Sequence, residues 1–387
     1  MALSRSSFFL RFVILSAIGH AYVGLRLIAD APVGTAIAAG GWLWLALSCM
    51  LIPMGMLSRR ASHPRPRGSA TAWIGLLALG FFSSLFVFTV LRDVVLLVAW
   101  IASLLGARVP LSSLRGGSAL LVPALALLGS IVGFINARGL ARVVTVSVPV
   151  AGLPEALENF TIVQISDVHV GPTIKAGYVR AIVDAVNAER PDMIAITGDV
   201  VDGSVEMLAA HTQPLGDLRA PNGVYLVTGN HEYYSGASAW VREFRRLGLR
   251  VLMNEHAVID IAGSKMVVAG VTDYTAGSHD PMQRSDPARA LAGASANAAV
   301  KILLAHQPRS APAAAPLGYT LQLSGHTHGG QFFPWGFFVR LQQPFTAGLY
   351  RHQGMWVYVS RGTGYWGPPK RLWAPSEITR IRLVRAD

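Results

Sequence analysis

Five short clusters of aspartate, histidine and asparagine lie in the C-terminal part of the chain, each directly after an apolar run. They read Asp167-Val-His169, Gly198-Asp199-Val-Val-Asp202, Gly229-Asn230-His231-Glu232, His306-Gln-Pro308 and Gly325-His326-Thr-His328. A single polar cluster after a strand is ordinary, because strand ends turn into solvent. Five clusters of carboxylate, amide and imidazole groups indicate instead that side chains from separate strand ends converge on one divalent-metal site.

The spacing inside two of these clusters also favours metal binding. Side chains two residues apart in an extended segment point to the same side, so Asp167 and His169 can reach one ion. The same reasoning applies to His326 and His328. A glycine begins three of the five clusters, and glycine permits the tight turns that bring the following side chains to a metal.

The apolar runs before the clusters have the length of buried strands, and helical patterns separate them. Candidate strands are Thr161–Ser166, Met193–Thr197, Val224–Thr228, Lys265–Val271, Lys301–Ala305, Thr320–Ser324 and Trp356–Ser360. Strands that alternate with helices predict a layered α/β domain. In such folds ligands bind beyond the carboxyl ends of the strands, which is where most of the clusters lie.

In this order the five clusters resemble the motifs of the calcineurin-like metallophosphoesterase superfamily, which are D-x-H, G-D-x-x-D, G-N-H-[DE], H and G-H-x-H. Further segments are similar to its bacterial YkuE-like branch: Gly229–Tyr234, Gly325–Gln331, Tyr358–Gly364 and Pro375–Ile378. The resemblance covers roughly residues 145–387. It implies a four-layer α/β/β/α sandwich that acts as a metal-dependent phosphoesterase.

The resemblance also implies two divalent metal ions. Mixed oxygen and nitrogen ligands suit Mn, Fe, Zn or Mg. One ion would be held by Asp167, His169, Asp199 and His328, and the other by Asp199, Asn230, His306 and His326. The bridging Asp199 would hold two mutually repelling cations at a fixed spacing. A metal-activated hydroxide would attack phosphorus, and His231 would protonate the leaving oxygen or stabilise the transition state.

Three further polar residues accompany these clusters. Asp202 is expected either to support a metal-binding side chain or to cap the helix that follows. Glu232 is expected to be a buried hydrogen-bond partner rather than an acid catalyst. Arg361 is a candidate for binding the substrate phosphate because it precedes a glycine-rich turn, and an ordinary surface arginine is the alternative.

The N-terminal third has the composition of a membrane-embedded region. Hydrophobic residues make up 52% of the chain and charged residues 14%, against about 25% charged in soluble proteins. Three runs have the roughly 20 apolar residues that a span needs, and a fourth contains Arg11, His20 and Arg26 and either spans or lies in the interface. These runs are Ala36–Leu57, Ala72–Leu91, Ser118–Ala137 and, fourth, Phe8–Ile28. The shorter run Val94–Leu105 is expected to form an interfacial or re-entrant helix.

We therefore predict three parts: a transmembrane region of about four spans over residues 1–137, a linker over 138–158, and a metallophosphoesterase domain over 159–387. The single cysteine, Cys49, excludes internal disulfides and cysteine-rich metal sites.

The positive charge of the chain is concentrated in the membrane region. Of the net charge of +12, residues 1–150 contribute twelve arginines and two aspartates, which is +10. Arginines scattered between apolar runs indicate contact with anionic lipid, so nucleic acid is not expected as a partner. The loop Ser58–Ser69 holds four arginines and is predicted to be cytoplasmic. With four spans, both chain ends and the catalytic domain would then face the cytoplasm of a bacterial-type inner membrane.

An aromatic segment, Phe332–Phe338, follows the last histidine pair. Its rings either pack into the domain core or reach the bilayer interface, and the second alternative suits a lipid-linked phosphate or pyrophosphate as substrate. The spans then either bind that substrate or only anchor the enzyme. A different class of function is a non-catalytic transport or assembly protein with a metal-binding regulatory head. The spans lack the paired acidic residues of ion-coupled transporters, which disfavours transport.

Overall fold

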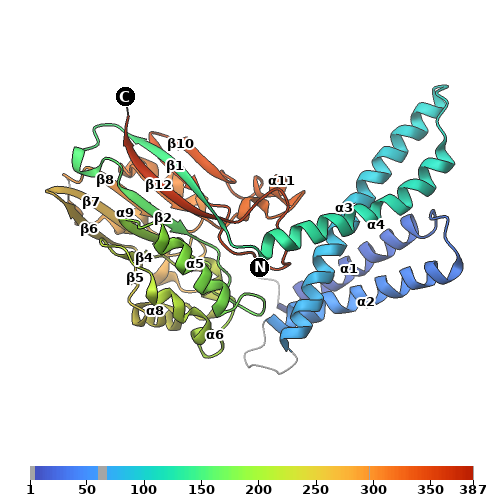
Figure 1. The fold of residues 1–387 in the computed structure, drawn as a ribbon, viewed down its shortest axis with the longest axis horizontal. Helices are drawn as coiled ribbons and strands as arrows, with labels where there is room; N and C mark the ends of the chain where they lie inside the picture. Colours follow the sequence, from blue (N-terminus) through green and yellow to red (C-terminus); the bar gives the residue numbers. More distant parts are fainter. Residues whose placement is uncertain (1–4, 60–67, 296, 387) are drawn as a thin grey trace. The chain divides into compact units, whose positions relative to one another are not determined.

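The computed structural model describes residues 5–59, 68–295 and 297–386 and divides the chain into two compact units. The helical unit comprises Met1–Ile135 together with Gly367–Lys370, and the α/β unit comprises Asn136–Trp366 and Arg371–Asp387. In Figure 1 the first is coloured mainly blue to cyan and the second green to red. The chain therefore leaves the α/β unit for four residues near its C-terminus and then returns to it.

Four long apolar helices make up most of the helical unit (Figure 1). They are α1 (Arg5–Leu27), α2 (Thr35–Arg59), α3 (Gly68–Leu104) and α4 (Leu111–Arg138). Each is long and apolar enough to cross a membrane, which confirms the four predicted spans as helices of that kind. Many of their large apolar side chains are exposed, among them Leu25, Leu47 and Leu128, as expected of a surface covered by lipid. The arginine-rich loop at 60–67 lies outside the described residues.

The run Val94–Leu105 does not form a separate interfacial helix; that prediction is wrong, because the run up to Leu104 is the C-terminal part of α3. The charged pair Arg92 and Asp93 lies directly before this run, inside α3. Arg92 Nη2 lies 2.5 Å from Asp30 Oδ2, and Asp93 Oδ2 lies 2.8 Å from Arg26 Nε. Pairing with an opposite charge lowers the cost of burying each group, so the helix continues through them.

Helices α2 and α3 approach each other closely at two glycines. A Cβ atom added to Gly55 would lie 2.7 Å from Gly75 Cα, a distance that real Cβ contacts do not reach. Small residues at a helix crossing allow backbones to pack at this range, as is common in membrane proteins. The pair Gly55 and Gly75 therefore sets the spacing of α2 and α3.

The short segment Gly367–Lys370 is held inside the helical unit by its lysine. Lys370 Nζ donates to the carbonyl oxygen of Gly80 at 2.9 Å, to Ser84 Oγ at 2.5 Å and to Ser130 Oγ at 2.9 Å. An ammonium group has three donors, and oxygens of α3 and α4 accept all three. The segment is thereby fixed to these two helices.

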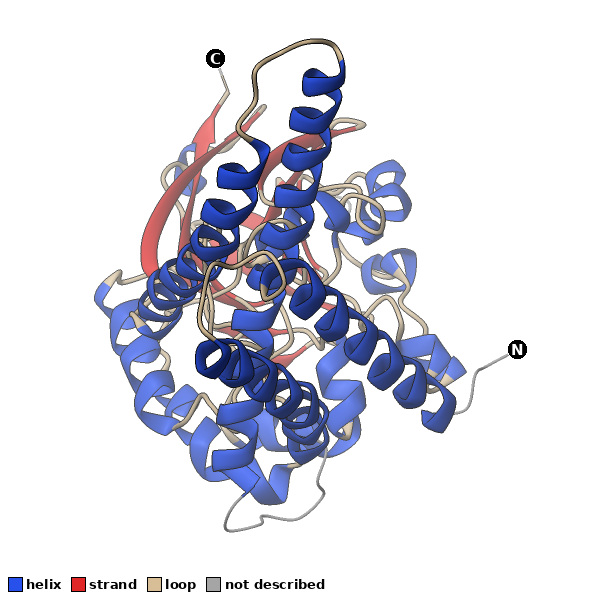
Figure 2. Cartoon of the chain, turned by 90° about the vertical axis from the view of Figure 1, so that its right-hand side faces the viewer, coloured by secondary structure: helices blue, strands red, loops and turns tan. Residues whose placement is uncertain are grey.

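Two mixed sheets of six strands form the centre of the α/β unit, within the described residues (Figure 2, strands in red). The first sheet is ordered β1 (Arg142–Val150), β12 (Glu377–Arg385), β2 (Thr161–Ile165), β3 (Met193–Ile196), β4 (Val224–Leu226) and β5 (Arg250–Val251). The second is ordered β10 (Gly348–His352), β11 (Met355–Val359), β9 (Leu321–Ser324), β8 (Val300–Leu304), β7 (Ser264–Gly270) and β6 (Glu255–Ile261). Strands β2 to β5 run parallel, and so do β11, β9, β8 and β7.

Three apolar cores separate four layers, as the resemblance implies. One core lies between the first sheet and α5 (Ala176–Ala188), α6 (Val205–Thr212) and α8 (Ala237–Arg246). A second lies between the two sheets, and a third covers the outer face of the second sheet under α9 (Pro287–Leu291) and α10 (Ala311–Ala314). Because side chains alternate along a strand, Ile162 of β2 enters the second core while Val163 enters the first.

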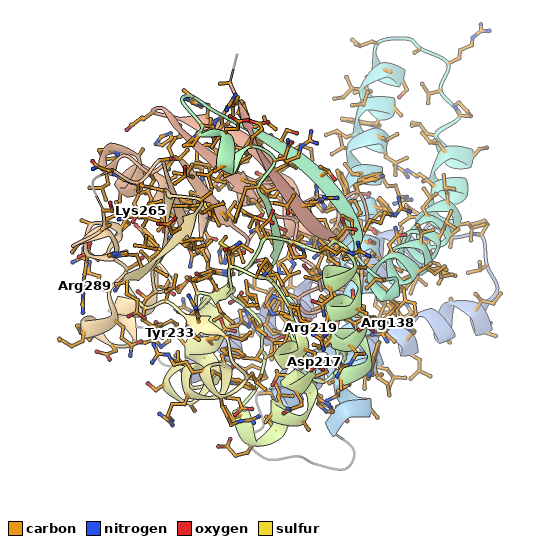
Figure 3. All side chains as sticks on the ribbon, turned by 60° about the vertical axis from the view of Figure 1, so that its left-hand side comes forward. Arg138, Asp217, Arg219, Tyr233, Lys265 and Arg289 are labelled. Atoms are coloured by element: carbon orange, nitrogen blue, oxygen red, sulfur yellow. The ribbon has the colours of Figure 1, made fainter. Side chains whose placement is uncertain are left out.

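The outer helical layer is fastened by polar contacts at the surface. Asp217, labelled in Figure 3, lies 2.5 Å from Arg180 of α5, and the backbone N–H of Arg219 donates to Asn187 Oδ1 at 2.9 Å. These contacts join α5 to the segment that follows α6. The exposed ion pair adds little stability, since such pairs contribute about 0–1 kcal/mol.

All seven candidate strands form, as β2, β3, β4, β7, β8, β9 and β11. The segment 138–158, by contrast, is not only a linker, because it contains β1. This strand pairs in parallel with β12 from Arg142 opposite Glu377 to Val150 opposite Arg385. The alternating valines explain the difference: Val148 and Val150 enter the core between the sheets, so the run is extended and half buried.

Candidate metal centre

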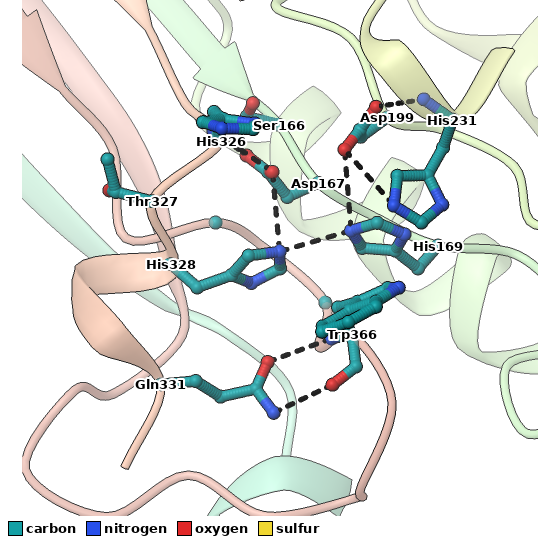
Figure 4. A network of polar contacts seen from close by, with 12 residues as sticks. Ser166, Asp167, His169, Asp199, His231, His326, Thr327, His328, Gln331 and Trp366 are labelled. Atoms are coloured by element: carbon teal, nitrogen blue, oxygen red, sulfur yellow. Dashed lines mark hydrogen bonds and ion pairs between the residues drawn. The ribbon is translucent and has the colours of Figure 1, made fainter. Parts of the chain in front are cut away.

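The predicted ligands gather beyond the carboxyl ends of strands from both sheets, and Figure 4 labels five of them: Asp167, His169, Asp199, His326 and His328. Asp167 and His169 follow β2, Asp199 follows β3, and Asn230 begins α7 (Asn230–Ser235) after β4, while His306 follows β8 and His326 and His328 follow β9. Parallel strands end at one edge of their sheet, which is why residues far apart in sequence meet here. The two sheets thus each supply part of one site.

The ligands form two groups. Donor atoms of Asp167, His169 and His328 lie within 4.8 Å of one another, and so do those of Asp199, His306 and His326. Asp199 reaches toward both groups, because its Oδ2 lies 3.2 Å from His306 Nε2 and 3.9 Å from His169 Nε2. The arrangement gives two adjacent positions for cations with one carboxylate between them.

The charges of Asp199 and His326 favour cation binding. Burial tends to raise the pKa of Asp199, but the neighbouring His306 and His231 hold that pKa well below its usual range. Burial, and next the charge of His306, lower the pKa of His326 to about 3. An ionised carboxylate and a neutral imidazole are the forms that ligate a metal. His306 differs: burial tends to lower its pKa, but Asp199 raises that pKa well above its usual range.

One buried oxygen favours a bound cation at this site. Asn230 is 7% exposed, and its Oδ1 accepts no hydrogen bond from the part of the chain that the structure describes. A buried carbonyl oxygen without a donor is costly, by about 1–3 kcal/mol. A divalent cation bound beside Asp199 would satisfy this oxygen, so the residues present fit the implied ions.

The backbone is strained at most of the predicted ligands. Positive φ angles occur at Asp167 (54°), His169 (54°), Asp199 (52°), His326 (71°) and His328 (50°). Non-glycine residues rarely adopt this conformation, and they do so mainly where a site requires it. Glycine is needed between them: a Cβ at Gly229 would overlap Asp199 Oδ1, and a Cβ at Gly325 would overlap Ser166 Oγ.

Hydrogen bonds orient two of the histidine rings in the way usual for metal ligands. His306 Nδ1 lies 2.7 Å from the carbonyl oxygen of Thr197, and His169 Nδ1 lies 3.1 Å from Asp202 Oδ1. An acceptor at Nδ1 places the ring proton there and leaves Nε2 for a metal. His328 differs, because its Nδ1 lies 3.0 Å from Nη2 of the buried Arg371.

The structure places the two accessory carboxylates of the sequence analysis in different roles. Asp202 pairs with the rings of His169 and His231, and the cap of α6 is Ser204 instead. Glu232 is fully buried and accepts the backbone N–H groups of Asp199, Val200, Val201 and Gly229 at 2.7–3.2 Å. Glu232 is therefore the buried hydrogen-bond partner that was expected, and it shapes the turn that carries Asp199.

His231 lies at the open side of the centre. Its Nε2 is 4.0 Å from Asp199 Oδ2, close enough that the ring also forms a possible ligand group with His169 and Asp199. Two exposed aromatic rings flank it: the ring centroid of Tyr234 is 5.2 Å away and that of Trp366 is 5.9 Å away. The sequence does not predict that either ring lies beside His231, because a single aromatic residue carries no information about which residues it contacts in the fold.

Arg361 lies beside the site but is already paired. Its Nη1 is 2.8 Å from Oε2 of the buried Glu377, and its side chain is 35% exposed. A Cβ at Gly329 would lie 3.1 Å from Arg361 Cγ, so the side chain packs against the turn after His328. Its contact with substrate phosphate stays a prediction.

The aromatic segment after the histidine pair is divided between interior and surface. Phe332 is 8% exposed, whereas Trp335, Phe337 and Phe338 on and around α11 (Trp335–Val339) are 46%, 71% and 54% exposed. We call these last three residues the aromatic surface. A separate surface hollow at the amino ends of β3 and β4 is lined by Arg190, Arg219 and Arg250 among others and contains none of the ligands.

The α/β unit is similar to known metallophosphoesterase proteins. The family model for the calcineurin-like phosphoesterase domain matches residues 160–330. The chain is similar to a transmembrane protein with a metallophosphoesterase domain from Bos taurus, at 41% identity over 268 residues, covering 66% of this chain and 60% of that protein.

Two bacterial proteins are covered more completely. They are an uncharacterized metallophosphoesterase from Aquifex aeolicus, 34% identical over 62% of this chain and 91% of its own length, and the uncharacterized metallophosphoesterase YkuE from Bacillus subtilis, 30% identical over 60% and 81%. The match to the Bos taurus protein spans about 60% of that protein's length.

Proposed function

Because the chain belongs to the calcineurin-like phosphoesterase family, we propose that it hydrolyses phosphate monoesters or diesters with two divalent ions bound around Asp199. The observation that carries this proposal is the convergence of carboxylate and imidazole groups from four other segments around one buried carboxylate, Asp199. The exposed rings of Tyr234 and Trp366, which flank His231, support a substrate with an apolar part.

When bound, the ions would supply Lewis acidity and an activated water. The residues of the chain would hold the ions in place and supply a proton. Asp199 lies between the two ligand groups and would keep two cations together by screening their repulsion. His231 pairs through Nδ1 with Asp202, so that its Nε2, on the side of Asp199, can give a proton to the leaving oxygen.

We further propose a lipid-linked phosphate or pyrophosphate as the substrate class. The aromatic surface follows the ligand His328 by only a few residues, and Trp and Phe side chains favour the membrane interface. The same chain carries four apolar helices, which make it a membrane protein and keep the site near lipid. A bacterial-type inner membrane, with the site facing the cytoplasm, is the location that the arginine distribution favours.

The test is hydrolysis by the full-length protein in detergent, with Mn or Zn added, of a matched pair of soluble and lipid-anchored phosphoesters. Asp199→Asn serves as the blank. We expect metal-dependent turnover of both esters and a preference for the lipid, each absent in the blank. Turnover of neither ester would favour the alternative, a non-catalytic transport or assembly protein with a metal-binding head.

The role of the aromatic surface is tested separately with Trp335→Ser combined with Phe337→Ser. Both side chains are exposed, so the change leaves the core intact. We expect the lipid-anchored ester to lose most of its turnover and the soluble ester to keep it. Equal loss on both esters would contradict a lipid-contacting role.

A further inference from the structure

The indole of Trp366 is held beside His231 by an uncommon backbone clamp. Gln331 Nε2 donates to the carbonyl oxygen of Trp366 at 2.8 Å, and the backbone N–H of Trp366 donates to Gln331 Oε1 at 2.8 Å (Figure 4). One side-chain amide therefore satisfies both backbone groups of one residue. Such a pair of bonds fixes the position and the orientation of the Trp366 backbone.

The clamp is tied to the metal centre through the chain. Gln331 is 7% exposed, and its backbone N–H donates to the carbonyl oxygen of the ligand His328 at 3.0 Å. It also has a positive φ of 59°, a conformation that costs backbone energy in a residue other than glycine. The backbone position of Trp366, from which the indole projects, is thus tied to the turn that carries His328.

Trp366 and Tyr234 are exposed although they are large and apolar. They are 46% and 64% exposed, and their ring planes are inclined by 74° and 65° to that of His231. His231 is the residue that would protonate the leaving oxygen. The leaving group of the ester, which is bonded to that oxygen, therefore lies next to these two rings.

From this arrangement we propose that Trp366, positioned by Gln331, and Tyr234 form a binding site for an apolar leaving group, such as the alkyl chain of an alcohol. The inference rests on the proposed phosphoesterase function and specifies which bond is cut. A water oxygen bonds to phosphorus and that water releases a proton to solvent. The bond from phosphorus to the alcohol oxygen breaks, and the alcohol oxygen takes a proton from His231 Nε2, which solvent then replaces. The products are the free alcohol and phosphate.

The experiment uses the full-length protein with Mn and a series of soluble alkyl phosphates from methyl to hexyl, whose alcohols have similar acidity. In the unchanged protein we expect kcat/KM to rise about twofold per methylene, as for roughly half-buried CH2 groups. Trp366→Ala should flatten this dependence, and Trp366→Phe should keep most of it. Trp373→Ala is the matched control, because Trp373 is 75% exposed and its ring contacts Phe333 instead.

An equal chain-length dependence in Trp366→Ala and the unchanged protein would overturn the inference while leaving the phosphoesterase proposal intact. If no ester is hydrolysed, the proposed function fails, and binding of non-hydrolysable alkylphosphonates, measured by calorimetry, still decides the inference. Binding that strengthens with chain length in the unchanged protein and not in Trp366→Ala supports the apolar site. The same dependence in both proteins rejects it.

Discussion

Asp202 Oδ1 lies 2.5 Å from His231 Nδ1. The same oxygen lies 3.1 Å from His169 Nδ1. One carboxylate therefore orients both the proposed acid and a metal ligand, and it leaves the Nε2 atom of each ring on the side of Asp199. Supporting contacts of this kind are typically worth tenfold to a hundredfold in activity or metal affinity.

Replacement of Asp202 by asparagine should lower kcat by about tenfold to a hundredfold. The amide has no charge with which to stabilise a protonated His231, and it cannot accept equally from both rings. Steady-state kinetics and the metal content of the purified protein measure the effect. Asp217→Asn, at an exposed carboxylate paired with Arg180, is the control and should change neither quantity.

Replacement of His231 by alanine should reduce kcat by about a hundredfold to ten-thousandfold, the usual contribution of a general acid. The metal content should stay the same, because the two ligand groups around Asp167 and His306 do not need this ring. Elemental analysis of the variant decides between roles. Loss of one metal would make His231 a ligand, as its distance from Asp199 allows.

Removal of metal by a chelator should abolish hydrolysis, and added Mn should restore it. Asp199→Asn should prevent the recovery, since both ligand groups depend on this carboxylate. The readout is metal bound per chain after dialysis, followed by activity. Asp260→Asn, at an exposed strand position, should recover fully; full recovery in Asp199→Asn as well would argue against a shared ligand.

Replacement of Glu232 by glutamine should destabilise the α/β unit by about 1–3 kcal/mol. Four backbone N–H groups donate to this fully buried carboxylate, and an amide offers them only one acceptor oxygen. Chemical unfolding of the full chain in detergent provides the measurement. Glu255→Gln is the matched change at an exposed residue, and a similar loss there would show that the effect is not specific.

Two glycine-to-alanine changes in α2 should have opposite effects. At Gly55 the added methyl group would meet Gly75 of α3 at 2.7 Å and force the helices apart, so the thermal midpoint in detergent should fall. At Gly40 nothing lies within 4 Å, and alanine should stabilise the helix by up to about 1 kcal/mol. A fall at Gly40 or none at Gly55 would contradict the close packing of α2 and α3.

Much of this molecule follows from sequence alone, because the signals are local. Apolar runs of strand length predict β2, β3, β4 and β8, and runs of membrane length predict the four helices. The order of the polar clusters predicts which residues meet, since the carboxyl ends of parallel strands share one edge. The identity of the ligand residues is therefore carried by short motifs.

What the tertiary structure decides depends on contacts between distant residues. Arg92 stays inside α3 because Asp30 pairs with it, and β1 forms within the expected linker because β12 lies beside it. Asp202 pairs with two histidine rings and does not cap a helix. Gln331 holds the backbone of Trp366, which lies 35 residues further along the chain. No local pattern encodes these pairings, because each partner is chosen by where the fold brings it in space.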